Sequence, residues 1–131
     1  MTTDTIFAPI TGRGGAVTVI RISGPLALAI TEKLTNGLLN PRHASLKKLR
    51  YQGQVLDHAL VTIFPGPQSF TGEDSAELAL HGGRAVLAAV SAALTALGAR
   101  YAEPGEFSRR AFGNGRMNLV EAEAMADLIA A

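Results

Sequence analysis

The sequence predicts an α+β fold, in which a mixed or largely antiparallel sheet packs against helices. Three segments, residues 16–23, 49–54 and 59–64, are rich in β-branched or alternating apolar residues, as strands are. The alanine-rich stretch at 84–97 has the length and composition of a helix. Strands and helices mix without the regular βαβ rhythm of a parallel sheet, and this favours the α+β class.

Length and composition indicate one folded domain. The chain has 131 residues, of which 47% are hydrophobic and 18% charged. Its net charge of +1 argues against nucleic-acid binding dominated by electrostatics. It has no cysteine, and its 3 histidines lack ligand spacing, so neither a disulfide nor a metal site is expected. The first residues lack signal-peptide features and no apolar segment is long enough to span a bilayer, so a cytoplasmic protein without membrane contact is expected.

The first half of the chain reads as short strands joined by turns and one helix. Residues 5–8 predict a strand that ends before Pro9, and the glycine-rich turn TGRGG then leads into the strand at 16–23. Pro25 suits the first turn of a helix of about ten residues. Residues 35–45 read as a loop. The strands at 49–54 and 59–64 are predicted to be antiparallel, because little chain separates them.

The second half predicts two further strands, one long helix and a short turn of helix. After the turn-rich segment FPGPQSFTG, alternation predicts a strand that runs to residue 81. The helix at 84–97 is apolar nearly all round, so it is predicted to be largely buried and to end at Gly98. A short strand at 99–102 precedes Pro104 and a turn of helix through Phe112.

The last segment predicts the start of a further helix. Asn118 and Glu121 have the spacing of a capping box, after a break at Asn114-Gly115. No stop signal follows before the final residue. The sequence therefore reads as the front part of a longer chain.

The segment GRGG at residues 12–15 does not have the pattern of a phosphate-binding loop. A P-loop follows a strand, opens a helix and carries a lysine and a hydroxyl residue, whereas these glycines precede a strand. The glycine pattern of a dinucleotide-binding site is excluded for the same reason, since it also follows a strand and opens a helix. The segment is interpreted as a tight turn. We expect no GTP hydrolysis by this chain alone.

Arg21 and Glu77 are charged residues inside strands whose other members are mostly apolar. Burying a charge is costly unless it is paired and hydrogen-bonded. Three interpretations stay open from the pattern: exposed strand residues, a structural salt bridge between the two, or side chains that face a ligand. A strand carboxylate suits a flat heterocycle with adjacent N–H donors, such as a 2-amino-4-oxo pteridine or a guanine. Arg21 would then suit an acidic tail or a ring carbonyl.

Other charged groups give weaker signals. Arg116 follows the Asn114-Gly115 turn and either supplies a third ligand contact or is a solvated loop residue. Glu73 and Asp74 are adjacent acids in a turn, and as a catalytic pair they are a weak signal. The basic residues Lys47, Lys48 and Arg50 are interpreted as a solvated face rather than a nucleic-acid patch. No nucleophile with an attendant base is evident, so no catalytic residue is assigned.

Several distinctive segments follow one another over almost the whole chain: TGRGG with VIRISGP, FPGPQSFTGEDSAEL with HGG, PGEFSRRAFGNGRMNL, and EAEAMADLI. Together, in this order, they resemble the MnmE/TrmE family of tRNA-modification GTPases. The resemblance implies an N-terminal domain at residues 1–117, related to the folate-binding domain of aminomethyltransferases. Residues 118–131 would be the first helix of a truncated central helical domain.

The resemblance also implies a function, cofactors and partners. The domain would form a homodimer and bind a reduced folate, 5-formyl-tetrahydrofolate or 5,10-methylene-tetrahydrofolate, as one-carbon donor for carbon five of a tRNA wobble uridine. The flavoprotein MnmG/GidA would be the partner. GTP, magnesium and potassium would bind only in a G domain that these residues do not include.

The folate contacts of the family fall on Arg21, Glu77 and Arg116. Arg116 stands where many members have lysine, which keeps the charge but changes the geometry. Asn118 stands in place of the usual aspartate, and Ala130 stands where an aspartate is common. Two alternatives stay open: a structural dimerisation domain in which Arg21 and Glu77 form an internal ion pair without ligand, and a free-standing folate-dependent one-carbon transferase.

Overall fold

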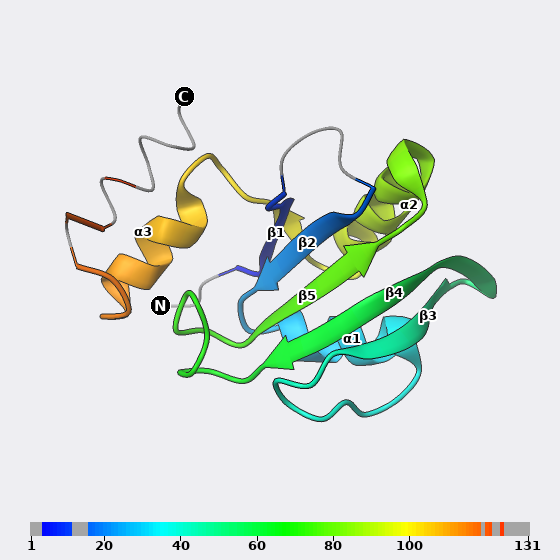
Figure 1. The fold of residues 1–131 in the computed structure, drawn as a ribbon, viewed down its shortest axis with the longest axis horizontal. Helices are drawn as coiled ribbons and strands as arrows, with labels where there is room; N and C mark the ends of the chain where they lie inside the picture. Colours follow the sequence, from blue (N-terminus) through cyan, green and yellow to red (C-terminus); the bar gives the residue numbers. More distant parts are fainter. Residues whose placement is uncertain (1–3, 12–15, 119, 122–123, 125–131) are drawn as a thin grey trace.

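The computed structural model describes residues 4–11, 16–118, 120, 121 and 124. In this part of the chain, strands and helices follow one another without a regular βαβ alternation (Figure 1). Their bounds are β1 (Ile6–Pro9), β2 (Thr18–Ser23), α1 (Ala27–Thr35), β3 (Ser45–Tyr51), β4 (Gln54–Phe64), β5 (Ser75–Leu80), α2 (Gly83–Ala96), β6 (Arg100–Tyr101) and α3 (Glu106–Gly113).

The strands form one 6-stranded sheet in the order β3-β4-β5-β2-β1-β6. All neighbouring strands are antiparallel except β1 and β6, which are parallel. The sheet is therefore mixed, and the predicted α+β class is confirmed. The predicted antiparallel pairing of the two strands before the turn-rich segment is confirmed as well.

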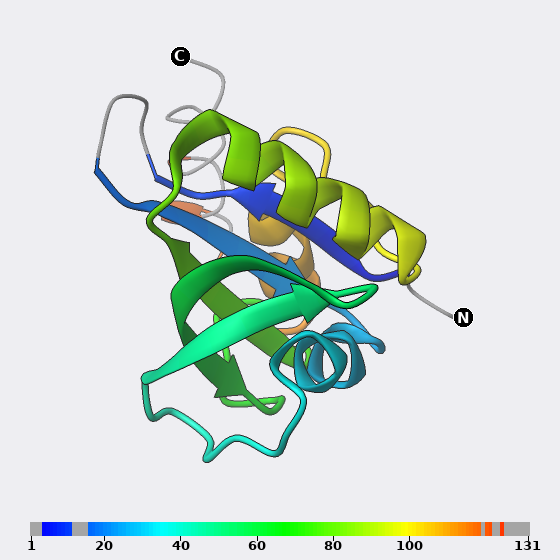
Figure 2. The same cartoon turned by 90° about the vertical axis from the view of Figure 1, so that its right-hand side faces the viewer.

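Helices α1 and α2 cover the same face of the sheet and enclose the core with it (Figure 2). Alternate residues of β2 and β5 point to this side, among them Ile20, Ile22, Leu78 and Leu80, each at most 1% exposed. From the helices they meet Ile30, Leu34, Val90 and Leu94.

Helix α3 lies beside the sheet near the end of β2, where Arg110 Nη1 donates to the Ser23 carbonyl at 3.5 Å (Figure 1). Arg21 alternates with Ile20 and Ile22 along β2, so its side chain lies on the face away from α1 and α2. The ring of Phe107 in α3 lies 5.5 Å from the Arg21 guanidinium carbon. The face of the sheet away from the apolar core is therefore contacted by α3 through Phe107.

The β3–β4 hairpin differs from the predicted strand limits. Gln52 and Gly53 both have positive φ, at 50° and 78°, as in the type I′ turns that join two strands directly. Strand β3 ends before this turn, and β4 begins directly after the turn. The start of β3, at Ser45, lies within the predicted loop at 35–45. The predicted limits were wrong because Gln-Gly was taken as strand rather than as the turn.

Two proline positions also depart from the prediction. Pro9 is included in β1, opposite Ile20, rather than lying beyond its end. The neighbouring strand β6 pairs only with Ile6 and Phe7, so the missing N–H of Pro9 leaves no ladder bond unmade. Helix α1 begins at Ala27 with Leu26 as its N-cap, so Pro25 precedes the helix instead of occupying its first turn.

Helix α2 is buried on one side only, so the prediction of a largely buried helix was wrong. Val90, Ala93 and Leu94 are at most 2% exposed, whereas Ala89 and Ala92 on the other side are exposed. Alanine covers little area and tolerates exposure well in a helix, so an apolar composition did not require burial here. The predicted end of the helix is confirmed, with Gly98 at φ 110°.

The predicted capping box at the start of the last helix is confirmed. The Asn118 side chain accepts a bond from the Glu121 backbone N–H at 2.8 Å. The Glu121 carboxylate accepts one from the Asn118 N–H at 3.1 Å. The continuation of this helix to residue 129 lies outside the described residues, as do residues 12–15 of the predicted glycine turn. The domain division at residue 117 and the relation to aminomethyltransferases stay predictions.

Candidate functional site

Arg21 and Glu77 lie directly opposite each other on β2 and β5. The Nε and Nη2 atoms of Arg21 both donate to Oε2 of Glu77, at 3.3 and 3.2 Å. The side chains are 16% and 31% exposed, so the pair is sheltered but reaches solvent. The ion pair that the sequence left as one interpretation is therefore present, on the sheet face away from α1 and α2.

Two aromatic rings flank the Arg21 guanidinium. Its carbon lies 4.4 Å from the ring centroid of Phe70, which belongs to the loop between β4 and β5. Phe107, buried in α3, contributes the second ring. A planar guanidinium over an aromatic face is an attractive cation–π arrangement. Sequence reasoning did not select either phenylalanine, because their contact with a strand residue depends on chain segments far apart in sequence.

The loop that carries Phe70, residues 65–74, is closed by its own hydrogen bonds. Asp74 Oδ1 accepts a bond from the Gly66 N–H at 2.8 Å, and Ser69 Oγ donates to the Glu73 carbonyl. A Cβ on Gly66 would lie 2.9 Å from the Gly72 carbonyl oxygen, closer than real contacts allow. The loop therefore holds Phe70 in place before any ligand arrives, and Asp74 has a structural role here.

Arg116 docks on the same loop. Its Nε donates to the Ser69 carbonyl at 3.2 Å, and the neighbouring Asn114 side chain donates to the Thr71 carbonyl at 2.8 Å. Gly72 permits this approach, since a Cβ there would lie 2.8 Å from Asn114 Cβ. The structure thus brings Arg21 and Glu77 into direct contact and places Arg116 beside the residue preceding Phe70. Among the described residues, no hydrogen bond joins Arg116 to Arg21 or Glu77.

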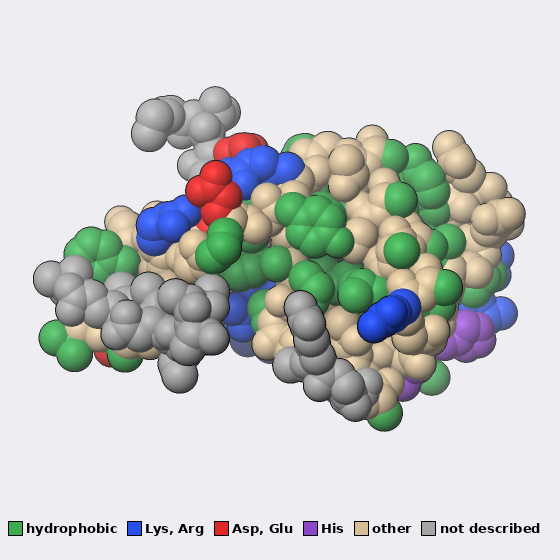
Figure 3. All heavy atoms as spheres, turned by 90° about the horizontal axis from the view of Figure 1, so that it is seen from above, with side chains coloured by type: hydrophobic (Ala, Val, Ile, Leu, Met, Phe, Trp, Pro, Cys, Tyr) green, Lys and Arg blue, Asp and Glu red, His purple; other side chains and the backbone are tan. Residues whose placement is uncertain are grey.

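A chain of ion pairs holds α3 against the sheet behind this site. Glu73 accepts bonds from Ser23 Oγ at 2.7 Å and from Arg110 at 3.0 Å, and Arg110 also contacts Glu106 at 3.3 Å. Glu106 in turn binds Arg100 at 2.7 Å. Acidic and basic side chains lie side by side near the α3 end of the molecule (Figure 3). Sequence reasoning missed this network and treated Glu73 only as a weak catalytic signal; the structure gives it a structural contact.

Glu106 is the most strongly perturbed acid of this network. Hydrogen bonds from Arg100 lower its pKa from 4.5 to about 2, against the opposing effect of burial, and the Glu103 N–H contributes in the same direction. The pKa of Asp4 is also lowered, mainly by its hydrogen bond with Arg100. These carboxylates are therefore charged partners that hold α3, rather than proton donors near neutral pH.

Three basic residues of β3 and His81 lie apart from the Arg21–Glu77 pair and make no hydrogen bond to it. Lys48 and Arg50 are exposed on β3, whereas Lys47 is half-buried, so the three do not form one continuous patch. His81 Nδ1 lies 2.8 Å from the His58 carbonyl oxygen. Within the described residues, no group of three acidic or histidine side chains is placed to hold a metal ion. No helix in the described part of the chain is long and apolar enough to cross a membrane.

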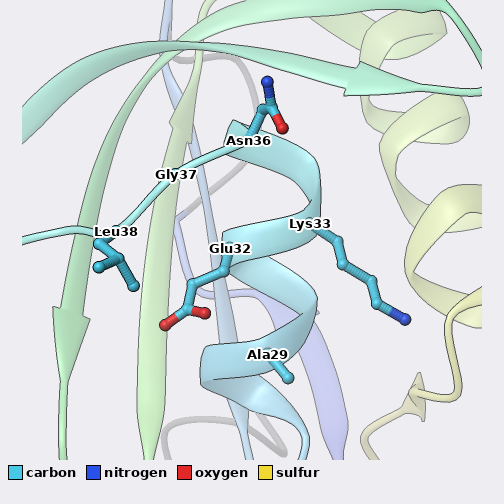
Figure 4. Close-up of a pocket in the computed structure, with 6 residues that line it drawn as sticks. All are labelled: Ala29, Glu32, Lys33, Asn36, Gly37 and Leu38. Carbon is cyan, nitrogen blue, oxygen red and sulfur yellow. The ribbon is translucent and has the colours of Figure 1, made fainter.

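A separate hollow of about 480 Å³ lies against the outer side of α1 (Figure 4). Glu32 and Lys33 contribute the charged side chains, and Leu38 is 84% exposed at its edge. α1 packs on the core side of the sheet, so this hollow lies away from Arg21 and Glu77. It is open and has no aromatic side chain, and we therefore place the candidate site at the Arg21–Glu77 pair.

The chain matches known proteins over most of its length. The family model of the GTP-binding protein TrmE N-terminus matches residues 5–116. The chain is 55% identical over 127 residues to a protein named tRNA modification GTPase MnmE from Acidiphilium cryptum, a match that covers 96% of this chain and 29% of that protein.

Two further relatives carry the same name. The match to the protein from Methylobacterium radiotolerans is 57% identical over 131 residues and covers 97% of this chain and 30% of the relative. The match to the protein from Caulobacter vibrioides is 55% identical over 128 residues and covers 97% of this chain and 29% of the relative. The chain therefore spans less than a third of the length of these relatives. The match to the family model and the three relatives agree, and the chain belongs to the family of the TrmE N-terminal domain.

Proposed function

We propose that this chain is the reduced-folate-binding and dimerising module of a GTPase that modifies carbon five of the wobble uridine in tRNA. The observation that carries the proposal is the Arg21–Glu77 pair, which is partly exposed and lies against Phe70. Family membership supports the tRNA-modification context, since the relatives are named tRNA modification GTPases.

Each proposed contact uses the chemistry of its side chain. Glu77 binds the amino-pyrimidine edge of the pteridine through its carboxylate oxygens, a charge-assisted and directional contact. Arg21 binds a ring carbonyl or the acidic tail, and Arg116 supplies a further positive contact from the loop. The folate, as its 5-formyl or 5,10-methylene form, is the one-carbon donor. No residue of this chain is proposed to act as a catalytic acid, base or nucleophile.

The partners and the nucleotide belong to the wider assembly. The module forms a homodimer in the cytoplasm and works with a flavoprotein of the MnmG/GidA type on tRNA. GTP, magnesium and potassium bind to a separate G domain. This chain alone does not hydrolyse GTP, and a phosphate-release assay on the purified chain tests that directly.

The decisive test is a calorimetric titration with 5-formyl-tetrahydrofolate. We expect saturable binding, weakened at least tenfold, or roughly 1.4 kcal/mol, in Glu77→Ala. The matched control is Glu103→Ala, which removes an ion-paired carboxylate that is 72% exposed in the loop between β6 and α3. Equal affinity of Glu77→Ala and the control would exclude the proposed role of Glu77.

A second candidate is a structural dimerisation module without ligand. The ion pair itself favours it, because each charge already has a partner. It predicts no folate binding by a folded chain that sediments as a dimer. Titration and sedimentation of the same sample separate the two candidates.

A further inference from the structure

We propose that Glu77 and the Phe70 ring form a slot for the guanidine-like edge of a flat heterocycle, and that this ligand enters by exchanging with the Arg21 guanidinium. The inference rests on the proposed folate function and adds how the site selects its ligand. It assigns Phe70 as a specificity-determining residue and the Arg21–Glu77 pair as the contact that the ligand replaces.

The chemistry of the two groups is closely matched. A guanidinium is planar, presents adjacent N–H donors along one edge and offers a flat face for stacking. The 2-amino group and ring N3–H of a 2-amino-4-oxo pteridine present the same pair of donors along one edge of a planar ring. The pteridine edge can therefore bind the Glu77 carboxylate and stack on the Phe70 ring in the same way as the Arg21 guanidinium does.

The geometry of the existing pair leaves room for a better partner. Both donors of Arg21 reach the same oxygen, Oε2 of Glu77, at 3.3 and 3.2 Å. None of the bonds among the described residues uses Glu77 Oε1. A ligand that donates to both oxygens in parallel makes the stronger bidentate arrangement. The carboxylate side chain is 31% exposed, so such a ligand can reach it.

Phe70 is held as a fixed wall for this exchange. Its loop is closed through Gly66 and Asp74, and Asn114 and Arg116 fasten it from outside. Only the Arg21 side chain has to move, and its long stem permits this without a change in the strand. The released guanidinium stays next to the ligand, where it meets a ring carbonyl or an acidic tail.

The first test compares ring and non-ring side chains at residue 70. In titrations of the chain with 5-formyl-tetrahydrofolate, we expect Phe70→Leu to weaken binding at least tenfold. Phe70→Tyr keeps the ring and should stay within about twofold of the parent affinity. The control is Phe112→Leu, which changes a phenylalanine of α3 that is 45% exposed and outside the site. Thermal unfolding confirms that each variant is folded.

The second test observes the exchange itself. The Nε–Hε resonance of Arg21, assigned through its loss in Arg21→Lys, reports its bond to Glu77 in a nitrogen–proton correlation spectrum. Saturation with 5-formyl-tetrahydrofolate should move this resonance, whereas that of Arg109 on the outer side of α3 should stay in place. Binding by the parent chain with equal affinity in Phe70→Leu, or with an unmoved Arg21 resonance, would overturn the slot and leave the folate function standing. Absence of binding by the parent chain would overturn both.

Discussion

The two faces of the central sheet are built from the same strands but differ in chemistry. On the side of α1 and α2, Ile20 and Leu78 are fully buried in a hydrocarbon core. On the side of α3, their neighbours Arg21 and Glu77 form an ion pair that reaches solvent. Successive residues of a strand point to opposite faces, so one short segment serves both purposes.

This difference separates the source of stability from the source of specificity. Apolar burial contributes roughly 25 cal/mol per Å² and needs no particular partner. A partly exposed ion pair contributes little to stability, whereas removing one partner of a buried ion pair is costly. The helix-covered face should therefore carry most of the folding free energy, and the α3 face should carry the positions of the functional side chains. Four substitutions test this division.

The largest loss of stability should come from the core face. Leu78→Ala leaves a cavity at a fully buried position and should lower the free energy of unfolding by about 2–5 kcal/mol. The control Leu46→Ala, at a strand residue that is 65% exposed, should change it by less than about 0.5 kcal/mol. Urea denaturation measures both, and equal losses would contradict a one-sided core.

Next in size is the buried acid at the start of α3, Glu106. Glu106→Gln removes the charge that pairs with Arg100 and Arg110 and should cost roughly 2–3 kcal/mol at neutral pH. The lowered pKa of Glu106 means that its contribution is complete above pH 4.5 and is lost as pH falls toward about 2. Between these pH values, the free energy of unfolding should therefore fall more steeply with decreasing pH in the parent chain than in Glu106→Gln. Parallel pH curves would show that another group causes the acid sensitivity.

The Arg21–Glu77 pair should matter more for binding than for folding. Glu77→Gln should lower the free energy of unfolding by less than about 1 kcal/mol, because the pair is partly solvated. The same change should weaken folate binding at least tenfold. Measuring stability and folate affinity on one preparation distinguishes a functional pair from a structural one. In a structural pair, Glu77→Gln would lower stability strongly and leave the affinity almost unchanged.

The smallest effect is expected on the outer side of α2. Ala92→Lys places a charge at an exposed helix position and should change stability by less than about 0.5 kcal/mol. Its neighbour Ala93 is 2% exposed, and Ala93→Lys should be severely destabilising. A loss above about 1 kcal/mol for Ala92→Lys would mean that a partner covers this side of the helix.

Local patterns in the sequence predicted much of the fold. Alternation located β2 and β5, Gly98 located the end of α2, and the Asn118–Glu121 spacing located a capping box. Each of these features depends on residues close together in the chain. The errors arose where local signals were ambiguous: the Gln-Gly turn was taken as strand, and an alanine-rich helix was predicted to be largely buried.

The candidate site could be predicted only in part for the same reason. The strand pattern singled out Arg21 and Glu77 as unusual, but it left open whether they meet. Phe70 and Arg110 lie in segments that resemble the family, but no local pattern gives either residue a role. Nothing in a local pattern shows that Arg110 in α3 reaches Glu73 in the loop before β5.

The sequence by itself determined the α+β class, the alternation that divides each strand between two faces, and the family. The tertiary structure alone decided which charges are partners, which ring covers Arg21, and which side of α2 stays exposed. Arg21 meets Glu77 because β2 and β5 pair in one register, although 56 residues separate them in the chain. Register and strand order are set by packing over the whole domain, and a single strand read alone does not contain them.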